Sequence, residues 1–210
     1  MESLNFTEVA ALAPLIPLII SFFRYHSFDT KHYVLIVLIL FGGFTEILAS
    51  ILEEVYSNNL PLYHFYVWFE FTFIATVFHQ SYSGLISRKQ LLSLIIFFSA
   101  AAILNILFFQ DIWSFASHTR TLESLMVLGF AIRYFYLALQ DLRVKRIERT
   151  FSFWFSTAVL IYFSANLLLF IYSNMIMVED HSTFMQIWAM HGFLNILLYS
   201  FYAVALWQKE

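Results

Sequence analysis

The chain has 210 residues, of which 61% are hydrophobic, 20% aromatic and only 12% charged. A soluble domain is about half apolar and about a quarter charged, so this composition excludes a disordered chain and argues against a water-soluble enzyme. The net charge of −3 leaves no basic face for nucleic acid. The absence of cysteine removes disulfides and thiolate metal sites. The composition is therefore that of an integral membrane protein.

Seven apolar runs are long enough to cross a bilayer, since a spanning helix needs about 20 residues. In chain order they cover residues 9–23, 33–52, 62–79, 91–109, 122–139, 153–171 and 184–207. The first run is the shortest and contains Pro14 and Pro17, which a membrane helix tolerates when its neighbours satisfy the freed backbone groups. The connections are short, so residues 1–210 are expected to form one all-α bundle of seven transmembrane helices with no separate soluble domain.

The distribution of positive charge predicts the orientation, because Lys and Arg concentrate in cytoplasmic loops. Nine cations fall on one predicted side of the membrane. Arg120 falls on the other side, and Arg133 lies within a span. The N-terminus is therefore expected outside and the C-terminus inside. The start of the chain has no basic region typical of a cleaved signal, so the first span is expected to be retained. The nine cations on the predicted inner side are Arg24, Lys31, Arg88, Lys89, Arg143, Lys145, Arg146, Arg149 and Lys209.

Polar side chains within the spans are the strongest functional signal. Each costs about 2.5–3.5 kcal/mol at membrane depth unless it has a partner or a water-filled cavity. On the second span, Glu46 shares a stripe with Gly42, Ala49 and Glu53, and small residues indicate close helix packing, so Glu46 is expected to face the bundle. Helix direction places most of these groups at or outside the bilayer midplane, which predicts an outward-facing polar pocket with His64 near its rim. The predicted ligand-binding residues are Glu46, Glu70, Asn105, Glu123, Arg120, Asn166, His191 and Asn195.

Simpler interpretations stand beside this one. Asn105, Asn166 and Asn195 are typical of interhelical hydrogen bonds worth about 0.6 kcal/mol each. Arg120 and Glu123 are i, i+3 neighbours, either a structural ion pair at the outer rim or a gate to the pocket. Glu53 and Glu54 are expected simply to lie at the membrane interface.

Several chemistries are compatible with such a pocket. A metal-dependent lipid hydrolase is an alternative in which His64 and His191 hold zinc, although no HExxH spacing supports it and no cofactor is otherwise predicted. A retinal pigment is excluded, because no span contains the lysine that a Schiff base requires. A carrier and an accessory subunit of a larger system also remain open. The basic loop at 141–150 is a candidate docking site for a cytoplasmic protein partner, although anchoring of anionic lipid headgroups also explains it.

Five stretches and Glu70 resemble a group of small, uncharacterised bacterial proteins with seven transmembrane helices. The stretches are GFTE at 43–46, LPLYH at 60–64, TRTLES at 119–124, IYFSAN at 161–166 and HGFLN at 191–195. The resemblance covers nearly the whole chain and implies the same span count and a bacterial inner-membrane location. It implies no activity, because none is assigned to that group.

The functional prediction is thus a membrane protein that binds a small or lipid-like ligand in an outward-facing pocket. It would act as a receptor, a sensor subunit or a carrier, in contact with the lipid bilayer and without nucleic acid. An enzyme is the less favoured reading. The sequence identifies neither the ligand nor the oligomeric state.

Overall fold

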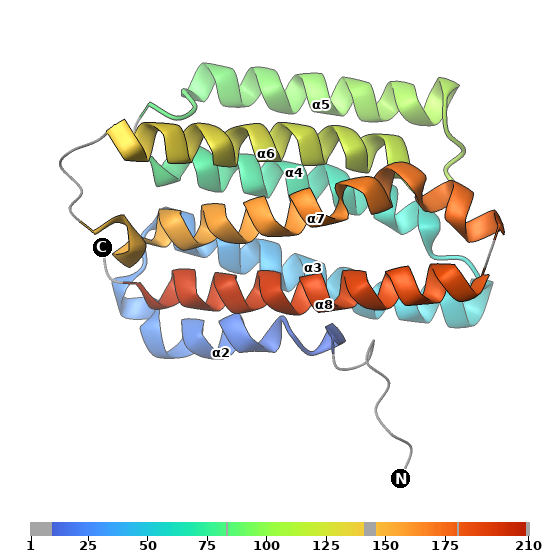
Figure 1. The fold of residues 1–210 in the computed structure, drawn as a ribbon, viewed down its shortest axis with the longest axis horizontal. Helices are drawn as coiled ribbons and strands as arrows, with labels where there is room; N and C mark the ends of the chain where they lie inside the picture. Colours follow the sequence, from blue (N-terminus) through green and yellow to red (C-terminus); the bar gives the residue numbers. More distant parts are fainter. Residues whose placement is uncertain (1–9, 83, 141–145, 180, 209–210) are drawn as a thin grey trace, which may run out of the picture.

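A computed structural model describes residues 10–82, 84–140, 146–179 and 181–208, and these residues form a bundle of seven α-helices. The helices alternate in direction along the chain, as Figure 1 shows. They are α2 (Leu15–Arg24), α3 (Thr30–Tyr56), α4 (Leu60–Ser81), α5 (Arg88–Phe108), α6 (Ser117–Gln140), α7 (Phe151–Glu179) and α8 (His181–Trp207).

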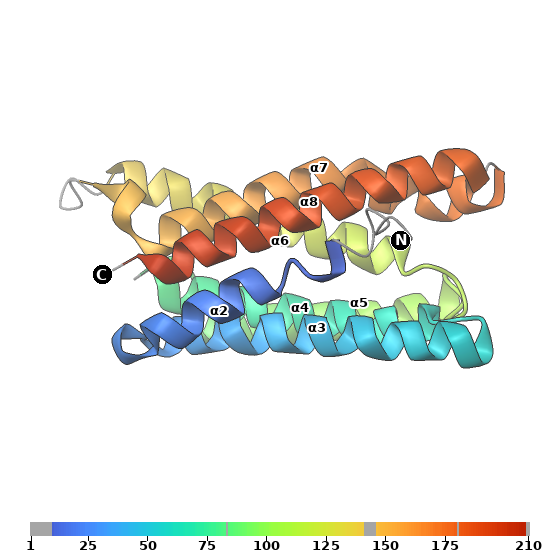
Figure 2. The ribbon, with the colours of Figure 1, turned by 90° about the horizontal axis from the view of Figure 1, so that it is seen from below.

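The helices pack in two layers joined by α6 and α2. Helices α3, α4 and α5 form one layer and α7 and α8 the other (Figure 2). Helix α6 packs against α4, α5 and α7, and α2 packs against α8 and α3. Helix α4 contacts α3, α5, α6 and α7, so it is the central helix of the bundle.

Five of the helices, α3, α5, α6, α7 and α8, are long and apolar enough to cross a membrane. This agrees with an integral membrane protein and is a smaller set than the seven predicted spans. Helix α4 has 22 residues, but His64 and Glu70 reduce its apolar character. Helix α2 has only 10 residues, a length of about 15 Å against a hydrocarbon layer of about 30 Å. The predicted first span at 9–23 is thus shorter in the structure, and residues 1–9 lie outside the described part.

Local sequence signals explain several helix ends. Ser87 and Gln90 form a capping box at the start of α5, in which Ser87 Oγ accepts from Gln90 N and Gln90 Oε1 accepts from Ser87 N. Helix α3 ends at Ser57, whose φ of 54° is left-handed, and α4 begins after two asparagines with Pro61 in its first turn. These signals produce the tight α3–α4 hairpin.

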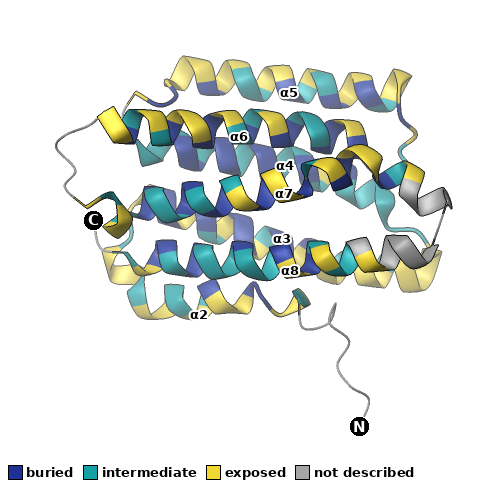
Figure 3. Cartoon of the chain, in the orientation of Figure 1, coloured by how far each residue is buried: buried dark blue, intermediate teal, exposed yellow. Residues whose placement is uncertain are grey.

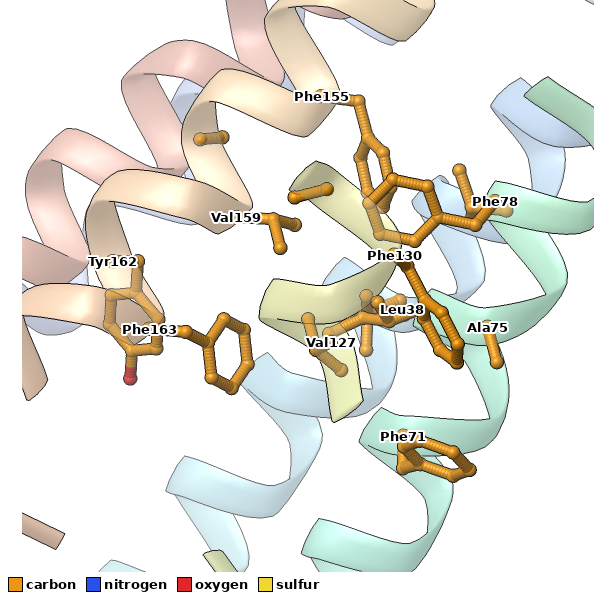
Figure 4. Packing of buried hydrophobic residues seen from close by; sticks show 14 of the residues in the cluster. Leu38, Phe71, Ala75, Phe78, Val127, Phe130, Phe155, Val159, Tyr162 and Phe163 are labelled. Carbon is orange, nitrogen blue, oxygen red and sulfur yellow. The ribbon is translucent and has the colours of Figure 1, made fainter. Parts of the chain in front are cut away.

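A dense aromatic core fills the half of the bundle where α8 ends. Phe78 makes edge-to-face contacts with Phe130 and Phe155, at ring-centroid distances of 5.8 and 5.0 Å. Phe155 in turn stacks on Tyr202 at 5.7 Å. Figure 4 shows Phe78, Phe130 and Phe155 gathered between α4, α6 and α7. Offset and edge-to-face pairs of this kind add about 0.5–1.5 kcal/mol each to the burial energy.

The outer surface of the bundle is strongly apolar. Large hydrophobic side chains such as Phe44, Ile47, Ile96 and Leu104 are exposed on α3 and α5. Exposed residues follow α5 along most of its length in Figure 3. An apolar surface of this extent has to be covered by a membrane or by a partner protein. A lipid bilayer around the helices would cover it.

The two ends of the bundle differ in charge. At the basic end, where α8 ends, lie the described cations Arg24, Lys31, Arg88, Lys89, Arg146 and Arg149. Here Arg24 Nη2 donates to the carbonyl of Trp207 at 3.0 Å and its guanidinium lies over the Trp207 ring, which fastens α2 to α8. At the opposite, acidic end lie Glu53, Glu54 and Asp111. The other cations of the sequence count, Arg143, Lys145 and Lys209, fall outside the described residues.

The orientation remains a prediction from this charge difference, and cysteine labelling tests it directly because the chain has no cysteine of its own. In intact cells, Ser57→Cys at the acidic end is expected to react with a membrane-impermeant maleimide. Ser27→Cys at the basic end is expected to react only after the membrane is permeabilised. The reverse pattern would place the acidic end in the cytoplasm.

Candidate functional site: a cavity between the two helix layers

A cavity of about 560 Å³ lies between the α3–α4 hairpin and the α7–α8 hairpin. It extends from the middle of the bundle to the α3–α4 turn at the acidic end. Charged and polar side chains on it come from α3, α4, α6 and α8, and aromatic side chains make up much of the remaining wall. The charged and polar side chains are Glu46, Glu53, Ser57, Asn58, Asn59, Glu70, Arg120, His191 and Asn195.

The short length of α2 explains where the cavity lies. In the basic half of the bundle α2 packs against α8 and α3, whereas its first residues form part of the cavity wall through Ala10, Ala11 and Pro14. Beyond them no described residue of the first helix separates α3 from α8. The space in the acidic half is therefore lined by the facing side chains of the two hairpins.

Gly42 lies at the inner limit of this space, under two tyrosine hydroxyls. A Cβ atom at position 42 would lie 3.2 Å from Tyr199 Oη and 3.5 Å from Tyr66 Oη. A Cβ atom here would therefore require Tyr199 to shift by a few tenths of an ångström, whereas its contact with Tyr66 would be an ordinary one. At the adjacent Gly43 an added Cβ would meet nothing within 4 Å.

Arg120 is the central charged group. Its Nη1 donates to Glu70 Oε2 and, at 3.0 Å, to Glu123 Oε2, so one cation joins a carboxylate of α4 to a carboxylate of its own helix. The guanidinium also lies over the rings of Tyr66 and Phe170, 5.2 and 5.3 Å from their centroids. The three charged residues are all buried in the described structure. The sequence predicts an ion pair between Arg120 and Glu123 at the outer rim. The pair is present, but both residues are buried inside the bundle.

Glu46 and Glu53 project from α3 into the cavity two turns apart. Both line it and both are exposed, in contrast to the buried Glu70. Among the described residues neither makes an ion pair, because the two described pairs join Arg120 with Glu70 and with Glu123. Glu54, the neighbour of Glu53, is exposed but does not line the cavity. The expectation that Glu53 lies only at the membrane interface is therefore incomplete.

His191 is held by a chain of hydrogen bonds whose direction can be read. Asn166 Nδ2 donates to the carbonyl of Tyr162 at 2.9 Å, so its Oδ1 faces His191 Nδ1 at 2.8 Å as an acceptor. Nδ1 of His191 must therefore carry a proton, and in the neutral ring Nε2 accepts from Asn195 Nδ2 at 3.1 Å. This arrangement leaves Asn195 Oδ1 as an acceptor on a residue that lines the cavity.

Four predicted residues do not line the cavity. Glu123 lies behind Arg120, and Asn166 lies behind His191, so each supports a residue that does line it. Asn105 belongs to a separate buried cluster in which it bonds Gln110, Thr119 and His118. His64 contacts the carbonyl of Ser114 at 3.0 Å through Nε2. The other five predicted ligand-binding residues converge on one space: Glu46, Glu70, Arg120, His191 and Asn195.

The Asn105 cluster and His64 fasten the α5–α6 connection. Gln110 Nε2 donates to Ser117 Oγ at 2.8 Å, and Asn174 of α7 donates to the same hydroxyl at 3.0 Å. Asn174 also exchanges two hydrogen bonds with the backbone of Phe115, at 2.9 and 3.1 Å. Phe115 lines the cavity and packs edge-to-face on Trp188. These polar groups thus position one wall of the cavity from outside it.

The aromatic side chains of the cavity did not emerge from the sequence. They include Tyr63, Tyr66, Phe115, Tyr162, Phe170, Trp188 and Tyr199. A usable signal exists, since Tyr66 precedes Glu70, Tyr162 precedes Asn166 and Tyr199 follows Asn195, each by four residues. Residues four apart share a helix face, so each predicted polar residue indicates an aromatic neighbour.

The described residues contain no group of three or more His, Asp or Glu side chains that could hold a metal ion. The two histidines of the zinc alternative are separately engaged. His64 bonds the Ser114 carbonyl, whereas both ring nitrogens of His191 contact asparagine side chains. Of the two, only His191 lines the cavity.

Removal of the Arg120 charge is expected to destabilise the fold strongly. Arg120→Met leaves Glu70 and Glu123 buried without a cation, a loss of about 3–5 kcal/mol for a broken buried pair. Thermal unfolding in detergent measures it, with Arg133→Met, an exposed cation on the same helix, as the control. The triple variant with Glu70→Gln and Glu123→Gln is expected to recover most of the loss. A single variant as stable as the parent would show that the three groups do not depend on one another.

Comparison of the chain with family models, with curated proteins and with solved structures finds no match in any of the three. The resemblance to a seven-span bacterial group therefore rests on the quoted stretches alone. The function has to be argued from the cavity itself.

Proposed function

We propose that this protein binds a small or lipid-like ligand in the cavity between its two helix layers. One observation carries the proposal: Glu46, Glu70, Arg120, His191 and Asn195 come from four helices and share a single cavity of about 560 Å³. Ligand sites are typically cavities of about 300–1,000 Å³ with a few converging polar groups among apolar and aromatic walls. Polar groups that served only to join helices would have no need of a common space.

The side from which the ligand enters follows from the charge distribution. The cavity reaches the acidic end through Ser57, Asn58 and Asn59. The positive-inside rule assigns this end to the outside, which is the periplasmic side in a bacterial inner membrane. Both the orientation and the bacterial location are parts of the proposal.

The closed basic half fits a receptor or sensor subunit, and it equally fits a carrier in its outward-open state. A carrier has to expose its site to both sides of the membrane in turn. Here Phe78, Phe130, Phe155 and Tyr202 pack tightly between the cavity and the basic end. A ligand-driven change in helix packing would be sensed at that end, where Arg146 and Arg149 are exposed. Docking of a cytoplasmic partner at loop 141–150 belongs to the same proposal, and residues 141–145 of that loop lie outside the described structure.

The position of Gly42 offers a test with a matched control. Gly42→Leu places a side chain under Tyr66 and Tyr199 at the base of the cavity, whereas Gly43→Leu on the same turn adds it where there is room. Three water-soluble phenyl probes of different charge serve as ligands: benzyltrimethylammonium, phenylmethanesulfonate and benzamide. Binding to protein in nanodiscs is followed by tryptophan fluorescence, because Trp188 lines the cavity.

At least one probe is expected to bind saturably to the parent and to Gly43→Leu, and about tenfold or more weakly to Gly42→Leu, since occlusion removes most of the contact area. Trp188→Phe is expected to abolish the fluorescence change on binding, which would identify Trp188 as its source. Saturation by none of the probes, or equal affinity of the two leucine variants, would contradict a ligand site in this cavity.

A further inference from the structure

The charges around the cavity do not balance. Three carboxylates line it, Glu46, Glu53 and Glu70, and Glu123 lies directly behind Arg120. The described lining contains only one permanent cation, Arg120, which is already shared by two of the four carboxylates. Glu46 and Glu53 therefore add negative charge that no described residue of the site neutralises. Glu54 and Asp111 add two further carboxylates at the acidic end of the bundle. The described loops at this end carry no Lys or Arg.

An anionic ligand would meet a cation whose charge is already compensated by two carboxylates. Arg120 pairs with Glu70 and Glu123 through Nη1, and the rings of Tyr66 and Phe170 lie over its guanidinium. A carboxylate or phosphate entering the site would also approach Glu46 and Glu53 without a compensating charge. Like charges at short range oppose binding, and more strongly as the surroundings become less polar.

The uncharged part of the wall suits a cation. Tyrosine and tryptophan rings line the cavity, and aromatic faces attract ammonium groups through their quadrupoles. Asn195 contributes an acceptor, because the chain from the Tyr162 carbonyl through Asn166 and His191 directs its amide nitrogen away to His191. Carboxylate, carbonyl oxygen and aromatic face are the groups that recognise an ammonium ion, and all three are present in one cavity.

We infer that the ligand is an organic cation, an ammonium group on an apolar or aromatic body, with Glu46 as its counter-ion. This inference rests on the proposed function and specifies its ligand class. Glu46 is the assigned partner because it lines the cavity without a described ion pair and lies one turn from Gly42, at the level of Tyr66 and Tyr199. Glu53, two turns nearer the acidic end, leads an entering cation toward it.

The three phenyl probes test the class directly. Benzyltrimethylammonium, which has no N–H and interacts through its charge alone, is expected to bind about tenfold or more tightly than phenylmethanesulfonate and benzamide because of the carboxylate and the aromatic rings. Glu46→Gln keeps the size of the side chain but removes its charge, and is expected to weaken binding of the ammonium probe by about tenfold, with little effect on benzamide. Glu54→Gln, an exposed carboxyl on the same helix that does not line the cavity, is the control and is expected to leave binding unchanged.

Two failures are distinguishable. Preferential binding of phenylmethanesulfonate, or an equal effect of Glu46→Gln and Glu54→Gln, would overturn the cationic class while leaving the cavity as a binding site. Loss of saturable binding for all three probes would remove the proposed function itself.

The source of the ammonium group is resolved by the lipid composition of the nanodisc. If lipid headgroups enter the site, phosphatidylethanolamine competes with the probe. Replacing phosphatidylglycerol by phosphatidylethanolamine is then expected to weaken binding of benzyltrimethylammonium more in the parent than in Glu46→Gln. Equal loss of affinity in the variant and the parent assigns the site to a free, water-soluble amine.

Discussion

The buried pairing of one arginine with two glutamates is the constraint on which the acidic half of the bundle depends. Arg120, Glu70 and Glu123 are buried among apolar helices, where an isolated charge has a prohibitive desolvation energy. Each is tolerable only because the others are within hydrogen-bond distance. Because Arg120 on α6 has to reach Glu70 on α4, the rotation of α6 and its position along α4 are fixed. This determines which residues of the two helices face the cavity.

The cavity follows from a mismatch between helix lengths. Six helices of 21 to 29 residues build the bundle, whereas α2 has 10. In the basic half α2 fills the space beside α8 and aromatic side chains fill the centre. In the acidic half the same space is bounded by carboxylates, an imidazole and tyrosines. A protein selected only for stability would fill such a space with apolar side chains, since unfilled volume weakens packing.

Hydropathy and charge were sufficient to predict an all-helical membrane bundle and the alternation of its helices. The sequence overestimated the first span because apolar residues continue on both sides of Pro14, and hydropathy does not show that the chain turns before Leu15. Glu46 was assigned to the interior because small residues share its stripe, and it does line the cavity. Asn105 was assigned to the same pocket because depth was the only available criterion. Depth cannot distinguish a residue that faces the α5–α6 connection from one that faces α8.

The partners of the predicted residues were the least accessible part. No spacing rule relates Arg120 to Glu70, which lie on different helices fifty positions apart, so only the local pair with Glu123 could be anticipated. The aromatic wall escaped notice for a different reason: tyrosines are so frequent in this chain that none stands out singly. Their relation to the polar residues becomes visible only when both are placed on the same face.

The clasp between Arg24 and Trp207 has a mechanical consequence. It ties the end of the first helix to the end of the last, with a hydrogen bond to a helix-terminal carbonyl and a stacked ring. The residues just before α2, Ala10, Ala11 and Pro14, line the cavity, as do Trp188, His191 and Asn195 of α8. The first and last helices are therefore joined at the basic end, so a displacement of either one beside the cavity also moves the other at this joint.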